Sequence, residues 1–248
     1  MAPAIAVVGR PMVIWDFDRT IMEDDSDRWV VTEMDLTHLF NQLRQTLPWN
    51  TLMDRMMEEL HSQGTTIEDI TNCLNRVELD PQIISAVRSA HTHGCDLKVL
   101  SDANHFFIET ILKNHGIYDC FSDIITNPSF VDEQGRLRIS PYHGSAHGCD
   151  LCPPNLCKGF VLNRIQDLTC EDIKKRVMIY IGDGGGDFCP TLKLSEEDHV
   201  MPRKDFPLHR LISKSSTPIK PKVHEWTNGK ELNKILIPLI DLVSPTDG

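Results

Sequence analysis

The sequence predicts an α/β fold, in which helices cover a parallel sheet and a further helical unit is inserted after the first strand. Two observations carry this prediction. Short apolar runs alternate along the chain with segments of helical periodicity, an order typical of parallel α/β sheets. A long helical stretch over residues 27–93 separates the first apolar run from the second. We therefore expect this stretch to form a unit beside the sheet.

The first strand is expected at Met12–Trp15, an uninterrupted apolar run that suits a strand buried on both faces. Asp16 and Asp18 follow it two positions apart, so their side chains project to the same side if the strand conformation persists. Two like charges buried together are unfavourable unless a cation lies beside them. Because ligands of open α/β sheets bind beyond the carboxyl ends of strands, the pair indicates either a binding site or a solvated turn.

The helical stretch is divided by Pro48, Gly64 and Pro81, each of which favours a helix boundary. Apolar side chains recur within it at the spacing of one helix face, and this stripe is expected to be core: Leu52, Met53, Met56, Met57 and Leu60. The block therefore indicates a helical insertion placed directly after the first strand.

The remaining elements alternate in the same way. Further strands are expected at 97–100, 123–126, 177–181 and 199–201, a hairpin at 130–139, and helices at 106–115, 158–166 and 229–242. The first of these strands ends in Ser101 and Asp102, and the third ends in a glycine-rich turn with Asp183 and Asp187. Lys158 lies at the start of a predicted helix. Polar groups thus follow three strand ends.

These polar groups match the needs of phosphate-monoester hydrolysis, one of the slowest uncatalysed reactions. An Asp carboxylate can attack phosphorus and form an aspartyl-phosphate. A Ser hydroxyl and a Lys ammonium can hold phosphoryl oxygens, and Mg²⁺ binds carboxylates and phosphate oxygens together. A phospho-accepting signalling module, which also places acids, a hydroxyl and a lysine around Mg²⁺, is the alternative of another class. Asp18 and the long insertion favour the enzyme.

A resemblance to the haloacid dehalogenase superfamily of phosphatases rests on four motifs in order: Asp16-x-Asp18-x-Thr20, Ser101, Lys158 and Gly182-Asp183-Gly184-x-x-Asp187. The resemblance implies a Rossmann-like core at residues 1–23 and 95–248, a helical cap at 24–94, and Mg²⁺ as cofactor. Asp16 would be the nucleophile and Asp18 the general acid/base. Both would hold the metal with Asp183, and Asp187 ranks below Asp183 in that role. Phosphate would be bound by Ser101 and Lys158.

Further segments resemble the phosphoethanolamine/phosphocholine phosphatase subfamily and its plant branch, described as thiamine phosphate phosphatases or inorganic pyrophosphatases: 26–27, 48–57, 101–104, 149–159, 182–190 and 201–203. In such relatives the acids that match Asp27 and Asp102 recognise a substrate amine, and carboxylates there would favour a cation. The alternatives are a helix N-cap for Asp27 and a turn carboxylate for Asp102. Trp29 and Trp49 are candidates either for stacking on the substrate or for cap core.

The resemblance also implies a ranking of the candidate substrates. Thiamine monophosphate comes first, phosphocholine or phosphoethanolamine next, and pyrophosphate is a further alternative that would give the two acids no cation to bind.

A short loop carries candidate zinc ligands: His147, Cys149, Cys152 and Cys157. The Cys-x₂-Cys spacing suits a tetrahedral zinc site, although such sites usually draw two ligands from further along the chain. The alternative is a loop of reduced thiols beside Lys158. Cys189 is expected to be a small buried residue. The other cysteines are scattered, which favours reduced thiols in the cytosol over a disulfide scaffold.

Composition narrows the range of partners. The 248 residues carry 25 Lys and Arg against 36 Asp and Glu, a net charge of −11, without a basic cluster that could grip nucleic acid. No apolar run reaches the roughly 18 residues that a membrane span needs. We therefore expect a cytoplasmic protein that binds a small cationic phosphate ester and neither nucleic acid nor membrane. The sequence leaves its oligomeric state open.

Overall fold

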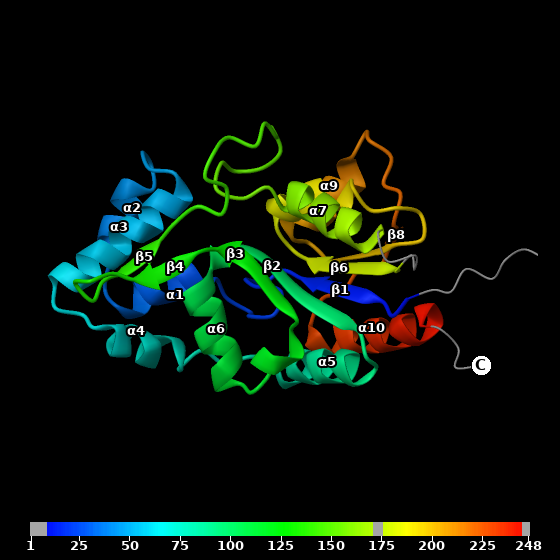
Figure 1. Ribbon diagram of the computed structural model, residues 1–248, viewed down its shortest axis with the longest axis horizontal. Coiled ribbons are helices and arrows are strands. Elements are labelled where there is room, and N and C mark those ends of the chain that lie inside the picture. Colours follow the sequence, from blue (N-terminus) through cyan, green and yellow to red (C-terminus); the bar gives the residue numbers. More distant parts are fainter. Residues whose placement is uncertain (1–8, 171–175, 245–248) are drawn as a thin grey trace, which may run out of the picture.

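The computed structural model describes residues 9–170 and 176–244. At its centre six strands form a parallel sheet in the order β3-β2-β1-β6-β7-β8, which confirms the predicted α/β fold (Figure 1). The strands are β1 (Met12–Trp15), β2 (Asp96–Asn104), β3 (Asp123–Asn127), β6 (Met178–Gly182), β7 (His199–Pro202) and β8 (Lys222–Val223). β1 is buried along its whole length between two neighbours, which explains its uninterrupted apolar sequence.

The order of the strands reverses at β1. From β1 the chain builds one half of the sheet through β2 and β3, and it later builds the other half through β6, β7 and β8. The carboxyl ends of β1 and β6 are therefore adjacent at a topological switch point, the place where open α/β sheets bind ligands.

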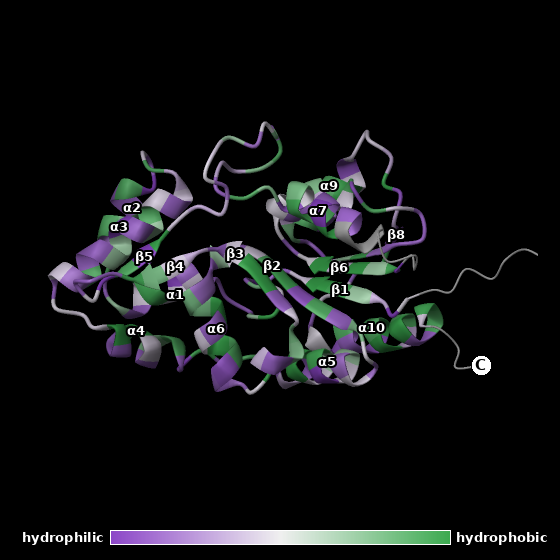
Figure 2. Ribbon diagram, viewed as in Figure 1, coloured by the Kyte–Doolittle hydropathy of each residue, from purple (hydrophilic) through white to green (hydrophobic). Residues whose placement is uncertain are grey.

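Alternate side chains of β1 enter two separate cores. Val13 and Trp15 pack in the core between the sheet and α5, α6 and α10. Met12 and Ile14 pack in the core between the sheet and α7 and α9. Figure 2 shows β1 and β6 coloured as hydrophobic between these two layers. The helices are α5 (Pro81–Thr92), α6 (His105–Asn114), α10 (Gly229–Val243), α7 (Lys158–Cys170) and α9 (Pro207–Lys214). Short elements complete this part: η1 (Tyr118–Cys120), η2 (Gly185–Asp187) and α8 (Phe188–Thr191).

Four helices follow the loop after β1, and we call them the inserted helices: α1 (Ser26–Glu33), α2 (Thr37–Leu43), α3 (Trp49–Ser62) and α4 (Ile67–Leu74). The predicted stripe on α3 is buried in full. α5 instead packs against α10 and the sheet, on the side away from α7 (Figure 1). The division into a core and a cap at 24–94 remains a prediction. We propose that the inserted unit ends before α5.

An antiparallel hairpin of β4 (Ser129–Val131) and β5 (Leu137–Ile139) lies where the sequence predicts one. It reaches from the end of β3 to the inserted helices, and β5 packs on α3 (Figure 1). Arg138 on β5 binds Asp54 on α3 through two bonds, Nε to Oδ1 at 2.9 Å and Nη2 to Oδ2 at 2.6 Å. The hairpin thus fastens the inserted helices to the sheet.

None of the helices within residues 9–170 and 176–244 combines the length and the apolar character that crossing a membrane requires.

Candidate active site

Three buried carboxylates meet where β1 and β6 end. Asp16 directly follows β1, and Asp183 directly follows β6. The η2 turn adds Asp187, and the three side chains offer oxygens that all lie within 4.8 Å of one another. The structure therefore places Asp16 and Asp183 together and brings Asp187 into the same group.

Three hydrogen bonds hold the loop after β1 in place. The amide of Asp16 donates to the carbonyl of Ile181 at 2.8 Å, which extends the pairing of β1 with β6. The amide of Phe17 donates to Asp16 Oδ1 at 2.8 Å. The hydroxyl of Thr20 donates to Asp183 Oδ1 at 3.2 Å. This last bond ties the loop to the neighbouring strand end.

Arg203, just after β7, supports the same loop. Its Nη1 donates to the carbonyl of Arg19 at 2.7 Å, and its Nη2 donates to Glu23 Oε1. Arg19 has a φ of 57°, a left-handed conformation that is uncommon for residues other than glycine. The buried guanidinium of Arg203 also packs over the rings of Phe206 and Trp226. Arg203 therefore helps to hold an unfavourable turn in place.

Lys158, the first residue of α7, bridges two of the carboxylates. Its Nζ lies 2.9 Å from Asp16 Oδ1 and 2.7 Å from Asp187 Oδ1, and the side chain is 4% exposed. Burial acts to lower the pKa of Lys158, but the charges of Asp16 and Asp187 outweigh it and raise that pKa above its usual value. Lys158 therefore stays charged beside Asp16 at neutral pH.

Asp187 uses both of its carboxylate oxygens within the protein. Oδ1 accepts from Lys158 and, at 2.7 Å, from the hydroxyl of Tyr180. Oδ2 accepts from the amides of Asp183 at 3.2 Å and Gly184 at 2.9 Å. Asp187 thus positions the ammonium of Lys158 and shapes the turn that carries Asp183. Sequence reasoning missed Tyr180, because its hydroxyl lies within an apolar strand and carries no motif.

The site holds more negative than positive charge. Burial, followed by the charge of Asp187, raises the pKa of Asp16, and the same two causes raise the pKa of Asp183 to about 7. One buried ammonium, that of Lys158, lies among the three carboxylates. A divalent cation would relieve the repulsion, and carboxylate oxygens are ligands that Mg²⁺ prefers. The donor set therefore fits a bound Mg²⁺, with Asp16 and Asp183 less occupied by protein bonds than Asp187.

Asp18 lies in a different environment. Its Oδ1 accepts from the amide of Ser26 at 2.8 Å, so the first turn of α1 reaches it. Burial, followed by the nearby charges of Asp25 and Asp27, raises the pKa of Asp18. A carboxyl group with a raised pKa holds its proton to a higher pH than an ordinary Asp, which suits a proton donor. Asp16 and Asp18, two positions apart in the sequence, thus have different partners.

Ser101 and Asp102 lie on β2, next to β1. Ser101 is fully buried, and its Oγ accepts from the amide of Ala103 at 3.3 Å. Asp102 is exposed, and its carbonyl accepts from Asn127 Nδ2 at 2.6 Å. The charge of Asp102 contributes to raising the pKa of both Asp16 and Asp27. Its carboxylate therefore lies near both acids.

Asp27 is buried in the first turn of α1. The N-cap of that helix is Asp25, whose side chain accepts from the amide of Arg28, so the N-cap alternative for Asp27 is wrong. Trp49 Nε1 donates to Asp27 Oδ2 at 2.6 Å, and Asn104 Nδ2 donates to Oδ1 at 3.4 Å. Burial is the largest cause that raises the pKa of Asp27 to about 8. A buried carboxyl group thus joins α1, α3 and β2.

The two tryptophans singled out in the sequence play different parts. Trp29 donates its ring N–H to the carbonyl of Cys73 at 3.2 Å, which links α1 to α4. Trp49 packs edge-on against Phe40 with ring centroids 5.5 Å apart, while its N–H is given to Asp27. Trp49 therefore connects the core of the inserted helices to Asp27.

The zinc ligand set expected from the sequence is not assembled. His147 Nε2 bonds to the carbonyl of Pro153 at 2.9 Å, and its Nδ1 accepts from the amide of Cys149 at 3.1 Å. Both ring nitrogens are thus engaged with backbone. The thiols of the loop instead gather around Cys189, which was expected only to be a small buried residue.

The chain is similar in sequence to known phosphatases. The profile of the Putative Phosphatase family matches residues 11–240. A thiamine phosphate phosphatase-like protein of Arabidopsis thaliana is 54% identical over 236 residues, 94% of this chain and 96% of that protein. Inorganic pyrophosphatase 2 of the same plant is 51% identical over 241 residues, 96% of this chain and 86% of that protein. Pyridoxal phosphate phosphatase PHOSPHO2 of Mus musculus is 31% identical over 230 residues, 89% and 95% of the two chains.

A solved structure shares the fold. A HAD family hydrolase of Salmonella enterica superimposes with a TM-score of 0.66 and 16% sequence identity, covering 93% of this chain and 72% of that chain. At this identity the likeness concerns the fold.

Proposed function

The chain belongs to the Putative Phosphatase family, within the plant thiamine phosphate phosphatase-like branch of the haloacid dehalogenase phosphatases, and we propose that it hydrolyses a small cationic phosphate monoester through a phosphorylated Asp16. The chain is thus an enzyme, a phosphatase, and the signalling-module alternative is not retained. The observation that carries the proposal is the position of Asp16, bonded to the ammonium of Lys158 beside Asp183.

The proposed reaction has two steps. A carboxylate oxygen of Asp16 attacks phosphorus, a new P–O bond forms, and the bond to the leaving oxygen breaks while Asp18 gives that oxygen a proton. Asp18 then takes a proton from water, whose oxygen attacks the same phosphorus and releases Asp16 and inorganic phosphate. The raised pKa of Asp18 suits the donor in the first step.

Charge on the phosphoryl group would be balanced by the residues around it. Lys158 contributes an ammonium and Ser101 a buried hydroxyl for its oxygens. When bound, Mg²⁺ would supply a Lewis acid that neutralises the phosphoryl oxygens. Asp16, Asp183 and the backbone carbonyl of Asp18 would hold it, while Asp187 keeps Lys158 in position.

The leaving group is proposed to be cationic. The carboxylate of Asp102 lies near both Asp16 and Asp27, Asp27 lies near Asp18, and the ring of Trp49 adjoins Asp27. A permanent cation such as the thiazolium of thiamine would favour the charged form of Asp27 and would be attracted by the carboxylate of Asp102. Thiamine monophosphate is therefore the first candidate substrate, supported by the name of the relative at 54% identity. Phosphocholine and phosphoethanolamine carry a comparable cation.

Pyrophosphate is the second candidate, supported by the relative at 51% identity that is named an inorganic pyrophosphatase. It offers no cation to Asp27 and Asp102. The same site would accept phosphate as the leaving group, so the chemistry at Asp16 would be unchanged.

A panel of kcat/KM values tests the proposal. The panel holds thiamine monophosphate, phosphocholine, phosphoethanolamine, pyridoxal phosphate and pyrophosphate. We expect thiamine monophosphate to rank first, and Asp27→Asn to lower its kcat/KM far more than that of pyrophosphate. The matched control is Asp35→Asn, which changes an exposed acid in the turn between α1 and α2. If pyrophosphate exceeds every cationic ester by about tenfold, the cationic leaving group is wrong.

A further inference from the structure

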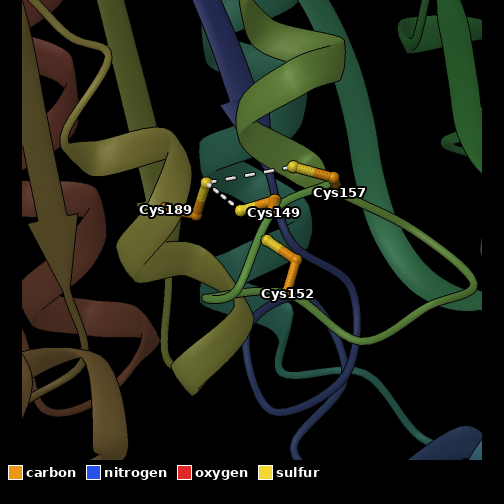
Figure 3. Close-up of side chains that lie close together, drawn as sticks. All are labelled: Cys149, Cys152, Cys157 and Cys189. Carbon is orange, nitrogen blue, oxygen red and sulfur yellow. Dashed lines mark hydrogen bonds between the residues drawn. The ribbon is translucent and has the colours of Figure 1, made fainter. Parts of the chain in front are cut away.

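Four thiols outside the proposed reaction lie together, and we call them the four-cysteine cluster: Cys149, Cys152, Cys157 and Cys189. Three belong to the loop that leads into α7, and the fourth belongs to α8. Figure 3 shows their sulfur atoms facing one another. All four are free cysteines, two of them buried and two half-buried.

The distances between the sulfurs suit a shared metal ion. All four sulfurs lie within 4.8 Å of one another, and Cys189 Sγ is 3.7 Å from Cys149 Sγ and 3.9 Å from Cys157 Sγ. A tetrahedral zinc ion with Zn–S bonds of about 2.3 Å holds its sulfurs about 3.8 Å apart. A disulfide would need about 2.05 Å. The spacing is therefore too long for a disulfide; it allows hydrogen bonds between the thiols and also suits four ligands around one cation.

The local backbone is built for this close approach. A methyl group at Gly159 would lie 2.4 Å from Cys189 Sγ, so glycine at this position lets the sulfur reach the first turn of α7. The amide of Phe160 donates to Cys157 Sγ at 3.3 Å. Hydrogen bonds of this kind orient metal ligands and stabilise a thiolate. Gly159 and the Phe160 amide therefore both support the cluster without belonging to it.

We propose that the four-cysteine cluster binds one zinc ion. Thiolate ligands select zinc over the harder divalent metals, and each thiol would release its proton on binding. Four protein ligands close the coordination sphere, so the ion would be structural and would not hold substrate or water. The cluster also has the separated ligands that the loop alone lacked, because Cys189 lies 32 residues beyond Cys157.

The ion would fasten two segments that carry active-site groups. Cys157 directly precedes Lys158, and Cys189 lies two residues after Asp187. Lys158 and Asp187 are joined by a bond of 2.7 Å. The zinc would therefore hold the start of α7 against α8 and keep this pair in register. Its removal is expected to lower stability and kcat, with a smaller effect on KM.

The test measures metal directly. The full chain is purified under reducing conditions and passed over a desalting column, and its zinc and iron are measured by mass spectrometry. We expect stoichiometric zinc. After the zinc is removed, a titration with CoCl₂ is expected to give the intense visible absorption of cobalt in a tetrahedral thiolate site.

Variants locate the ion. Cys152→Ser and Cys189→Ser are expected to weaken zinc binding by at least about tenfold, and Gly159→Ala to weaken it without removing a ligand. Cys120→Ser, which changes a half-buried thiol outside the cluster, is expected to keep its zinc.

Three results would overturn the proposal. The first is that the wild-type protein, kept reduced, holds no zinc and gives no cobalt spectrum. The second is that it holds iron in place of zinc. The third is that all four variants retain zinc equally. The cobalt titration uses wild-type protein, so it decides even if a variant fails to fold. None of these results tests the proposed phosphatase reaction, which the kcat/KM panel decides separately.

Discussion

The ammonium of Lys158 lies 2.9 Å from Asp16 Oδ1 and 2.7 Å from Asp187 Oδ1, so one buried cation joins the proposed nucleophile to the turn after β6. The two acids are brought together because β1 and β6 are neighbours at the point where the strand order reverses. Lys158 reaches both from the first turn of α7. Loss of Lys158 should therefore disturb both acids at once.

Replacing Lys158 tests that relationship. We expect Lys158→Met to lower kcat by about 10³-fold, because a buried charge that stabilises the transferred group is removed. We also expect stability to fall, since two buried carboxylates lose their shared ammonium. Kinetic assays and thermal unfolding measure the two effects. The control is Lys113→Met, which removes an exposed ammonium bonded to Glu109; similar losses in both variants would contradict the assigned role.

Asp27 should impose a pH dependence on the binding of cationic substrates. Burial holds its pKa at about 8, so the carboxyl group is largely neutral below that pH and charged above it. We expect the KM for thiamine monophosphate to fall as pH rises through about 8, and Asp27→Asn to raise KM by roughly tenfold or more and to abolish this trend. KM measured for pyrophosphate should show no such trend, and a trend that survives in Asp27→Asn would exclude Asp27 as its source.

The same group should also affect stability. Because the folded state raises the pKa of Asp27 from 3.8 to about 8, the folded chain holds a proton that the unfolded chain releases. Stability is therefore lost as pH rises between about 4 and about 8. We expect the melting temperature of Asp27→Asn to fall less than that of the wild type over this range. The Asp35→Asn control should follow the wild type.

The bond between Arg138 and Asp54 should control how firmly the inserted helices are held. Arg138→Ala removes both of its bonds to Asp54, and because the pair is partly exposed we expect a loss of only about 1 kcal/mol. The looser attachment should raise KM while kcat changes little. Arg55→Ala is the matched control, since the exposed Arg55 pairs with two acids on the same helix. Equal KM values in the two variants would show that the hairpin contact does not govern substrate binding.

Metal binding should stabilise the chain through Asp183. At Mg²⁺ about 100-fold above its dissociation constant, we expect the melting temperature to rise by roughly 5–10 °C after chelator treatment. Asp183→Asn should lose most of this rise, because it removes one of the two carboxylates that are proposed to hold the ion. Asp35→Asn should retain it. A rise of the same size in Asp183→Asn would place the ion elsewhere.

Much of this arrangement could be predicted from the sequence because it is local. The apolar run at Met12–Trp15 is what a strand buried on both faces requires. Because the acids follow this strand, they lie at the edge of the sheet where the carboxyl ends of the strands meet. The spacing of α3 likewise identified its buried face.

Other features depend on contacts between distant segments, which spacing does not reveal. Tyr180 could not be told from its apolar neighbours until its hydroxyl met Asp187. Cys189 joins three thiols from another part of the chain, and Asp25 rather than Asp27 caps α1. In each case a side chain is defined by a partner that lies elsewhere in the fold or by the backbone conformation at a helix start.

If phosphate is transferred to Asp16 during the reaction, the phosphorylated residue can be trapped and identified. An excess of the wild-type protein is mixed with thiamine monophosphate that carries a radiolabelled phosphate, and the reaction is quenched in acid within one turnover. The protein is then digested, and the labelled peptide is identified. We expect a label on the peptide that contains Asp16, and none in Asp16→Asn. Complete hydrolysis in a single turnover with no labelled peptide, or with the label on another residue, would show that Asp16 is not the nucleophile.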